Sequence, residues 1–348
     1  MIYNDNFIKA CLKQEVDHVP VWYMRQAGRY QAEYREIRKK HTLLDICKIP
    51  ELCAEVTTLP VQQLGVDAAI LFSDIMVPLG PMGVKYDIIE NRGPVLETPY
   101  RTAADIASLR SIQPEEDLSY VLETIKILAR ELKVPLIGFT GAPFTLASYM
   151  VEGGPSRNYI RTKQLMYCHP EEWTQLMEKL GDMVITYLKA QVEAGAKAVQ
   201  IFDSWVGALA AADYVKYVYP TMKRIFEELK DLQAPKIYFG GVSSGELLPL
   251  FRELDTEVIG LDWRVPISEG RRRIGDRFDV QGNLDPALLL APWPILEQKA
   301  KEIIDQGLEK PGFVFNLGHG IFPEVPGDML KRLTDFVHEY SQSVLKNR

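Results

Sequence analysis

Charged and polar side chains that can bind carboxylates recur directly after short apolar runs. Arg25 and Arg29 follow the first such run, Asp74 follows the second, Ser204 follows a central one and His319 follows the last. The planar guanidinium group of arginine binds a carboxylate through two parallel hydrogen bonds. The two arginines therefore predict a site for a small acidic molecule, with the other three residues as further contacts.

Asp74 is the carboxylate expected within these cationic surroundings. A nearby cation lowers the pKa of a carboxyl group, so the sequence predicts that Asp74 is ionised. It could accept N–H hydrogen bonds or stabilise a positive charge that develops on a substrate; the alternative is a structural Arg–Asp ion pair. His319 is the natural group to titrate between about pH 6 and 7, although a histidine in such a place is often only a hydrogen-bonded loop residue.

Turns after strands favour Gly, Asp, Asn and Ser for conformational reasons alone. That explanation covers the glycines of these segments well. It accounts less well for two arginines, a histidine and the adjacent pair Ser73 and Asp74. The functional interpretation of these positions is therefore favoured.

The sequence lacks the residues that several kinds of catalytic chemistry require. No lysine lies at the carboxyl end of an expected strand, where it could form a Schiff base, and no HxH, HExxH or GxxxxGK[ST] motif is present. The five histidines are scattered along the chain. The segment GGVSSG at 240–245 predicts a tight turn before a helix, with phosphate binding as the minority alternative. These gaps predict a site that needs no cofactor and no metal ion.

The elements that would position the site residues alternate along the chain. Short, almost continuously apolar runs are separated by stretches of helical periodicity, as expected for parallel strands covered on both faces. The carboxyl ends of such strands meet at one mouth, so we expect an α/β fold: a single (β/α)8 TIM barrel domain over residues 1–348, with an elaborated loop or extra hairpin at 77–98 after the second strand. The expected strands are 19–24, 68–72, 135–139, 198–202, 237–239, 258–261, 278–281 and 313–315, and the expected helices include 171–194, 212–232, 294–306 and 328–345.

Composition and charge restrict the partners of the molecule. The 348 residues carry a formal net charge of −7 with a pI near 5.5, which argues against nucleic acid and anionic membranes as partners. No apolar stretch approaches the ~20 residues that cross a bilayer, and no targeting pattern is visible. Four cysteines without CxxC spacing predict reduced thiols. We therefore expect a cytoplasmic protein that acts on a small molecule.

Longer motifs carry a specific resemblance. They resemble motifs of uroporphyrinogen decarboxylases, occur in the same order and are spread over nearly the whole chain. The longest of them are too long for a chance match. The motifs are PVWYMRQAGRY (20–30), LFSDI (71–75), GFTGAPFTLASYMVEGG (138–154), QIFDSWVG (200–207), GLDWR (260–264), QGNLDP (281–286) and FNLGHG (315–320).

The resemblance implies a (β/α)8 barrel that works without a cofactor or a metal ion, usually as a homodimer. It also implies the reaction. The four acetate side chains of uroporphyrinogen III would lose their carboxyl groups and become methyls. The product would be coproporphyrinogen III, an intermediate of haem and related tetrapyrrole biosynthesis.

The resemblance further assigns roles to residues. Asp74 would accept hydrogen bonds from the central pyrrole N–H groups and stabilise positive charge there. Tyr149, a core residue by pattern alone, would hydrogen-bond near the reacting acetate, while Ser204 and His319 would contact acetate or propionate side chains. One loop would bind substrate carboxylates, and it consists of Arg25, Gln26, Ala27, Gly28 and Arg29. Both arginines of this loop would face the reacting acetate. The expected catalytic residues are therefore Arg25, Arg29, Asp74 and Tyr149.

Two other functions stay open at this point. A zinc- and corrinoid-linked methyltransferase of the same barrel family would need a His/Cys/Cys cluster at strand ends, whereas all four cysteines fall in expected helices. A non-catalytic tetrapyrrole-binding protein would use the arginine pocket without releasing CO2. Measurement of CO2 release and of bound zinc separates the three functions.

Overall fold

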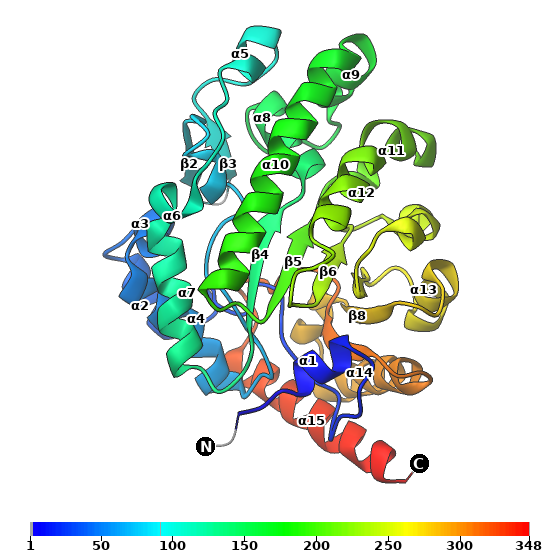
Figure 1. The fold of residues 1–348 in the computed structure, drawn as a ribbon. Helices are drawn as coiled ribbons and strands as arrows, with labels where there is room; N and C mark the ends of the chain where they lie inside the picture. Colours follow the sequence, from blue (N-terminus) through cyan, green and yellow to red (C-terminus); the bar gives the residue numbers. More distant parts are fainter. Residues whose placement is uncertain (1–2, 91, 348) are drawn as a thin grey trace.

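The computed structural model describes residues 3–90 and 92–347. Its centre is a curled parallel sheet of seven strands in the order β1-β4-β5-β6-β7-β8-β9, with helices around its outside (Figure 1). The fold is therefore α/β and similar to a TIM barrel. The strands are β1 (Ala69–Ile70), β4 (Leu136–Gly141), β5 (Ala198–Phe202), β6 (Lys236–Phe239), β7 (Val258–Gly260), β8 (Asp279–Leu284) and β9 (Phe313–Leu317).

The strands explain the continuous apolar runs of the sequence. Every residue of β4 through β9 is buried, because crossover helices cover one face of the sheet and side chains of other strands cover the other. Seven of the expected strands are confirmed, with bounds that shift by a few residues. Parallel pairing places their carboxyl ends at the same edge of the sheet, which is where the candidate site residues follow.

The first expected strand, 19–24, is not a regular strand, and this expectation was wrong in detail. Val21 forms a single parallel bridge with Phe315 of β9, and on its other side the oxygen of Val21 accepts a hydrogen bond from Asp67 N (2.7 Å), just ahead of β1. Pro20 has no N–H to donate, which interrupts a strand ladder. The segment therefore lies between β9 and β1 without forming a continuous ladder with either.

Buried polar side chains connect this segment to strands across the interior of the sheet. Trp22 Nε1 donates to Gln281 Oε1 of β8 (2.8 Å), and Gln281 Nε2 donates to Gln200 Oε1 of β5 (3.1 Å). All three side chains are buried. Since β5 and β8 are not neighbours in the sheet, these hydrogen bonds cross its concave side and close it around a packed interior.

The helices follow the expected positions with one exception. α10 (Pro170–Ala194), α14 (Trp293–Leu308) and α15 (Gly327–Lys346) match their expected ranges closely. The helix expected at 212–232 is instead divided into α11 (Ala211–Tyr217) and α12 (Tyr219–Glu228), because Pro220 in the first turn of α12 has no N–H for a preceding turn. The other helices are α1 (Asn6–Cys11), α2 (Ala32–Arg38), α3 (Leu43–Lys48), α4 (Pro50–Leu64), α5 (Ala103–Ala107), α6 (Pro114–Asp117), α7 (Ser119–Glu131), α8 (Pro143–Glu152), α9 (Ile160–Cys168) and α13 (Ile267–Ile274), with 3-10 turns at Val77–Leu79, Val206–Ala208, Gly245–Glu253 and Pro286–Leu290.

The stretch 77–98 contains an antiparallel hairpin of β2 (Tyr86–Ile89) and β3 (Gly93–Leu96). Leu96 N donates to the oxygen of Gly153 (3.0 Å), at the end of α8. Because α8 follows β4 directly, this hydrogen bond holds the hairpin near the carboxyl end of the sheet. Figure 1 shows the hairpin and α8 together, far from the two chain termini.

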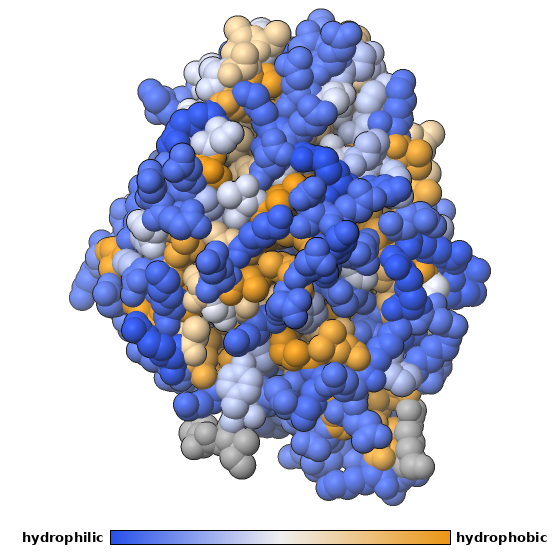
Figure 2. All heavy atoms as spheres, viewed as in Figure 1, coloured by the Kyte–Doolittle hydropathy of each residue, from blue (hydrophilic) through white to orange (hydrophobic). Residues whose placement is uncertain are grey.

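The surface and the cysteines agree with the composition. Figure 2 shows a face on which hydrophilic side chains predominate, with hydrophobic ones between them. Within residues 3–90 and 92–347, no helix combines the length and the apolar character needed to cross a bilayer. The cysteines lie in helices, as expected, and all four are free: Cys11, Cys47, Cys53 and Cys168.

Candidate active site

Arg25 begins the loop that follows segment 19–24. Its backbone has a φ of 63°, in the left-handed region that residues other than glycine seldom adopt. Its exposed side chain runs along Gly320, beyond β9: a Cβ atom on Gly320 would lie 2.4 Å from Arg25 Cδ. The backbone turn and the missing side chain together give the guanidinium group its path across the carboxyl end of the sheet.

Gln26 fixes the position of this loop through hydrogen bonds to the backbone. Its side chain is fully buried, with Oε1 accepting from Tyr23 N (3.1 Å) and Nε2 donating to the oxygen of Ala68 (3.1 Å). Both ends of the amide are therefore used within the protein. The sequence grouped Gln26 with the substrate contacts, whereas its side chain is placed to position the loop, and Ala27 and Gly28 stay half-buried above it.

Arg29 points toward the hairpin. Its Nη1 lies 3.4 Å from Glu90 Oε1, and both side chains are exposed. The sequence expected both arginines of the loop to face one acetate, but it is Arg25 whose charge acts on Asp74 and His319. An exposed ion pair contributes only about 0–1 kcal/mol, so a substrate carboxylate can replace Glu90 as the partner of Arg29 at little cost.

Asp74 lies a few residues beyond β1 and is half-buried. Its Oδ1 accepts a hydrogen bond from Met76 N (2.9 Å). Burial raises the pKa of Asp74 above its ordinary value, although the Met76 N–H and the charge of Arg25 act in the opposite direction. The expectation that neighbouring cations dominate was therefore wrong. A poorly solvated carboxylate gains more from a cation that arrives or forms beside it.

Tyr149 lies on α8 with its ring 5.9 Å from that of Trp205. Burial, and then the negative charge of Asp74, raise the pKa of Tyr149 to about 12, so the phenol keeps its proton at neutral pH. Hydrogen bonding to Trp205 and the charge of Arg25 lower this pKa by less. Tyr149, Asp74 and Arg25 therefore share one space, in which Tyr149 is a hydrogen-bond donor.

Ser204 follows β5 in a tight turn and is half-buried. Its carbonyl packs against Gly241 beyond β6, where a Cβ atom would lie 2.4 Å from Ser204 O and where φ is 67°. Only glycine satisfies both the close approach and the left-handed backbone. The glycine pair at 240–241 therefore leaves room for the turn after β5 that contains Ser204.

Asp203, the residue before Ser204, is a buried carboxylate at the base of the site. Oδ1 accepts from Thr145 Oγ1 (2.7 Å) and Oδ2 accepts from Tyr238 OH (2.9 Å). Thr145 Oγ1 also accepts from Trp205 N (3.2 Å). Because Thr145 stands one helical turn before Tyr149 on α8, Asp203 fixes both α8 and the turn after β5.

Replacing Asp203 with asparagine is expected to destabilise the protein by about 1–3 kcal/mol, since an amide NH2 cannot accept the hydrogen bond that the carboxylate oxygen accepts. Urea unfolding followed by circular dichroism measures the change. Asp213→Asn is the matched control, because Asp213 accepts a hydrogen bond from Tyr167 OH at an exposed position. Equal stability changes in the two variants would contradict the role of Asp203.

His319 lies beyond β9, half-buried, with its ring 6.4 Å from that of Trp263 and nearly perpendicular to it. Burial lowers its pKa to about 4, with further lowering by the charges of Arg25 and Arg264. The imidazole is therefore neutral at pH 7. The sequence expected a group that titrates between about pH 6 and 7, an expectation that holds only for a solvated histidine.

His319 is expected to titrate near pH 4 in the free protein. Its folded-state pKa lies below the ordinary 6.5, so the unfolded chain binds a proton that the folded protein does not. The stability of the wild type relative to His319→Gln should therefore be constant above about pH 6.5 and fall as the pH approaches 4. Histidine NMR, with His319→Gln for assignment, gives the midpoint directly. A midpoint near 6.5 would refute the burial argument.

Two tryptophans complete the site and were not among the expected site residues. Trp205 contacts Tyr149, and Trp263 contacts His319 while Arg264 stacks on it with the guanidinium carbon 4.1 Å from the ring centre. Each tryptophan follows an aspartate at the end of a strand, in FDSW and LDWR. That recurrent aromatic residue is the signal by which sequence reasoning could have found both.

Comparisons with known proteins agree on one family. The family model described as Uroporphyrinogen decarboxylase (URO-D) matches residues 3–340. A protein from Bacillus subtilis (strain 168) named uroporphyrinogen decarboxylase is 58% identical over 98% of this chain and 96% of its own length. One of the same name from Halalkalibacterium halodurans is 58% identical over 97% of this chain and 98% of its own length.

Solved structures with low sequence identity share the fold. A methyltransferase from Methanosarcina mazei superposes with a TM-score of 0.80 at 22% identity and covers 98% of this chain and 99% of its own. A B12-independent methionine synthase from Shewanella sp. W3-18-1 reaches a TM-score of 0.55 at 13% identity, over 85% of this chain and 89% of its own. At such identities the likeness concerns the fold alone.

Proposed function

This chain belongs to the uroporphyrinogen decarboxylase family and is a carboxy-lyase of tetrapyrrole biosynthesis, and from that premise we propose that it converts the four acetate side chains of uroporphyrinogen III to methyls, giving coproporphyrinogen III. One observation carries the proposal for the site. The Arg25 side chain lies against Gly320, the neighbour of His319, and its charge acts on Asp74, Tyr149 and His319, which come from the segment after β1, from α8 and from the segment after β9.

The reaction needs an electron sink, which we propose the substrate itself supplies. When the acetate loses CO2, the electron pair of the broken C–C bond must move away from the methylene carbon. Protonation of the pyrrole at its α-carbon creates a conjugated cation that accepts this pair. A proton then adds to the methylene carbon and the ring proton leaves, so that each cycle consumes one proton and releases one CO2.

Asp74 is placed to stabilise that cation. As a poorly solvated carboxylate with one oxygen held by Met76 N, it can accept pyrrole N–H hydrogen bonds with little reorganisation. Preorganised charge opposite the developing cation lowers the barrier in a site from which water is excluded. Asp74 thereby acts on the transition state more strongly than on the neutral pyrrole.

The other polar residues hold carboxylates and protons. Arg25 and Arg29 bind substrate carboxylates as bidentate donors. Tyr149, with a pKa of about 12, remains protonated and donates a hydrogen bond near the reacting acetate, directly or through water. Ser204 and neutral His319 contact the remaining acetate and propionate side chains.

We further propose that residues 1–348 form one closed barrel domain. Segment 19–24 takes the place of the eighth strand: Val21 bonds toward β9 on one side and toward β1 on the other, and Trp22 reaches Gln281 through the interior. The hairpin of β2 and β3 is then the elaboration of the loop after the second strand.

A homodimer in the cytoplasm is the proposed state of the protein, with no nucleic acid or membrane as a partner. Support comes from the family, and from exposed apolar side chains on α9 and α11, among them Ile160, Tyr167 and Val215. Sedimentation equilibrium measures the mass in solution; a monomer at micromolar concentration would contradict the dimer.

The methyltransferase function is not favoured. Its zinc site would need cysteines at the ends of strands, whereas Cys11, Cys47, Cys53 and Cys168 lie within α1, α3, α4 and α9. A non-catalytic tetrapyrrole-binding protein would leave the substrate unchanged, which the following assay tests.

The test is incubation of chelator-treated protein with uroporphyrinogen III under anaerobic, reducing conditions. The products are oxidised and separated by their number of carboxyl groups. We expect a ladder from eight to four carboxyls. Tight stoichiometric binding without any product would instead establish a carrier, and absence of both would contradict the proposed substrate.

A further inference from the structure

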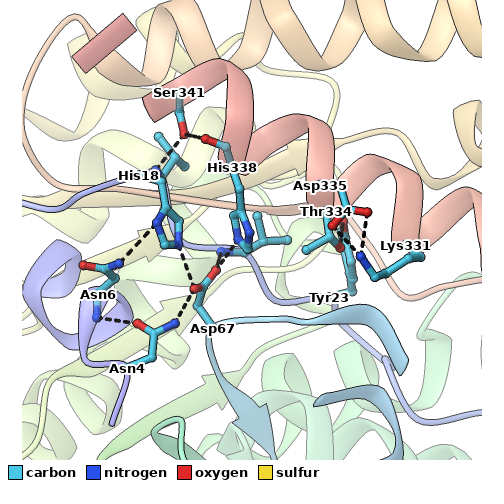
Figure 3. Close-up of polar contacts among 12 residues, drawn as sticks. Asn4, Asn6, His18, Tyr23, Asp67, Lys331, Thr334, Asp335, His338 and Ser341 are labelled. Atoms are coloured by element: carbon cyan, nitrogen blue, oxygen red, sulfur yellow. Dashed lines mark hydrogen bonds and ion pairs between the residues drawn. The ribbon is translucent and has the colours of Figure 1, made fainter. Parts of the chain in front are cut away.

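Two histidines and an aspartate form a cluster (Figure 3). Because Asp67 lies just before β1, the cluster lies at the amino ends of the strands, opposite the candidate active site. His18 precedes segment 19–24, Asp67 precedes β1, and His338 lies on α15. His18 Nε2 is 2.9 Å from Asp67 Oδ1, and His338 Nε2 is 2.7 Å from Asp67 Oδ2. The two imidazole rings, 4.2 Å apart between centroids, both point at the carboxylate in Figure 3.

We propose that His18, Asp67 and His338 bind one divalent transition-metal ion of the zinc or cobalt class. Their nitrogen and oxygen atoms lie within 4.8 Å of one another, so a single ion can reach one atom of each residue. Two imidazoles and one carboxylate form a donor set typical of zinc and other borderline metals. The reaction at the other end of the sheet does not use this ion.

Little movement is needed to admit the ion. With metal–ligand bonds of about 2.0–2.1 Å in tetrahedral geometry, neighbouring ligand atoms stand about 3.3 Å apart. The present nitrogen–oxygen separations of 2.9 and 2.7 Å run to the two different oxygens of Asp67 and are shorter than that value. The rings would therefore shift by roughly half an ångström, and their Nε2 atoms would bind the ion in place of these two hydrogen bonds.

The carboxylate is already oriented by two hydrogen bonds other than those from the histidines. Asn4 Nδ2 donates to Asp67 Oδ1 (2.7 Å), and Val21 N donates to Asp67 Oδ2 (2.7 Å). The hydrogen bonds from Asn4 and Val21 would remain as the outer shell that orients a ligating carboxylate.

The histidines provide access and further support. Their side chains are 18% exposed for His18 and 24% exposed for His338, against 1% for Asp67, so the site opens to solvent on the histidine side. A water molecule can complete a tetrahedral set from there. Asn6 Nδ2 lies 3.4 Å from His18 Nδ1, and rotation of this amide would present an oxygen to the Nδ1–H of a metal-bound imidazole.

A bound ion would join distant parts of the chain. It would tie α15 and the segment before 19–24 to the residue that precedes β1, next to the hydrogen bond between Asp67 N and Val21 O. Because the ion binds the folded protein only, the melting temperature should rise with its concentration. The decarboxylation rate should not change.

The test uses the full chain after removal of metals with a chelator. Co2+ is titrated with visible absorption as the readout, and Zn2+ with calorimetry. We expect one tight equivalent in the wild type, with cobalt bands of tetrahedral intensity. His18→Gln and His338→Gln should each weaken binding ~10²-fold or more, whereas His169→Gln, which changes an exposed histidine between α9 and α10, should bind as the wild type does.

A measurement on the wild type alone guards against variants that fail to fold. In 15N NMR of the histidines, Zn2+ should shift the Nε2 signals of two residues at one equivalent and raise the melting temperature. The proposal is overturned if the wild type shows no saturable binding, or if binding survives in both variants. Decarboxylation by the metal-free protein is assayed in parallel, so failure of the metal site is distinct from failure of the proposed reaction.

Discussion

Asp74→Asn is expected to lower kcat by about 10²–10³-fold, the usual cost of removing one preorganised electrostatic group, while the affinity for substrate changes little. Asparagine has nearly the same shape, and its oxygen can still accept the hydrogen bond from Met76 N. What it loses is the negative charge opposite the pyrrole cation. Because that cation forms only during reaction, the loss should fall on kcat rather than on KM.

Steady-state kinetics with uroporphyrinogen III and direct binding of the product measure this effect. Asp87→Asn, on the exposed side of β2, is the matched control and should keep the wild-type rate. If Asp74→Asn turns over near normally, the carboxylate does not stabilise a cation. If both kcat and binding collapse with the fold intact, Asp74 serves ground-state binding instead.

The sequence predicted the sheet because its signal is local. Seven apolar runs became strands of one parallel sheet, and the polar residues after them, such as Asp74, Ser204 and His319, came to one end. Two local failures have local causes. Pro20 interrupts the ladder of segment 19–24, and Pro220 divides the helix expected at 212–232, so closer attention to proline would have corrected both.

The pKa shifts of the site residues were not predictable from the same pattern. The sequence led us to expect a lowered pKa for Asp74 beside cations and an ordinary pKa for His319, but burial raises the first and lowers the second. Desolvation depends on how completely helices and loops cover each group, which neighbouring residue types do not reveal. For the same reason the sequence grouped Gln26 with the substrate contacts, although its side-chain amide forms hydrogen bonds with the backbone of Tyr23 and Ala68.

The His18, Asp67 and His338 cluster was beyond the reach of sequence spacing altogether. Metal motifs are recognised in a sequence when their ligands stand a few residues apart. This cluster instead combines two residues from the first part of the chain, His18 and Asp67, with His338 from the last helix. Tyr149 shows the opposite case. Its helix position was predicted, and only the family resemblance separated it from a core residue.

Gly320→Ala is expected to lower kcat/KM by ~10²-fold, because a displacement of about 1 Å at a substrate-positioning group has consequences of that size. The added Cβ would lie 2.4 Å from Arg25 Cδ and 2.9 Å from Arg25 Nε, so the arginine side chain must leave its path. No left-handed backbone is required at this glycine, so the fold should persist. Thermal melting checks that it does.

Two comparisons separate displacement of Arg25 from general damage. Gly327→Ala, where the nearest atoms lie 3.8 Å from the new Cβ, should have wild-type activity. In an Arg25→Ala background, Gly320→Ala should cause little further loss, since the side chain that it displaces is gone; the coupling in this double-mutant cycle then equals most of the single effect. Additive losses would mean that Gly320 acts on the substrate directly, and that Arg25 reaches the acetate by another path.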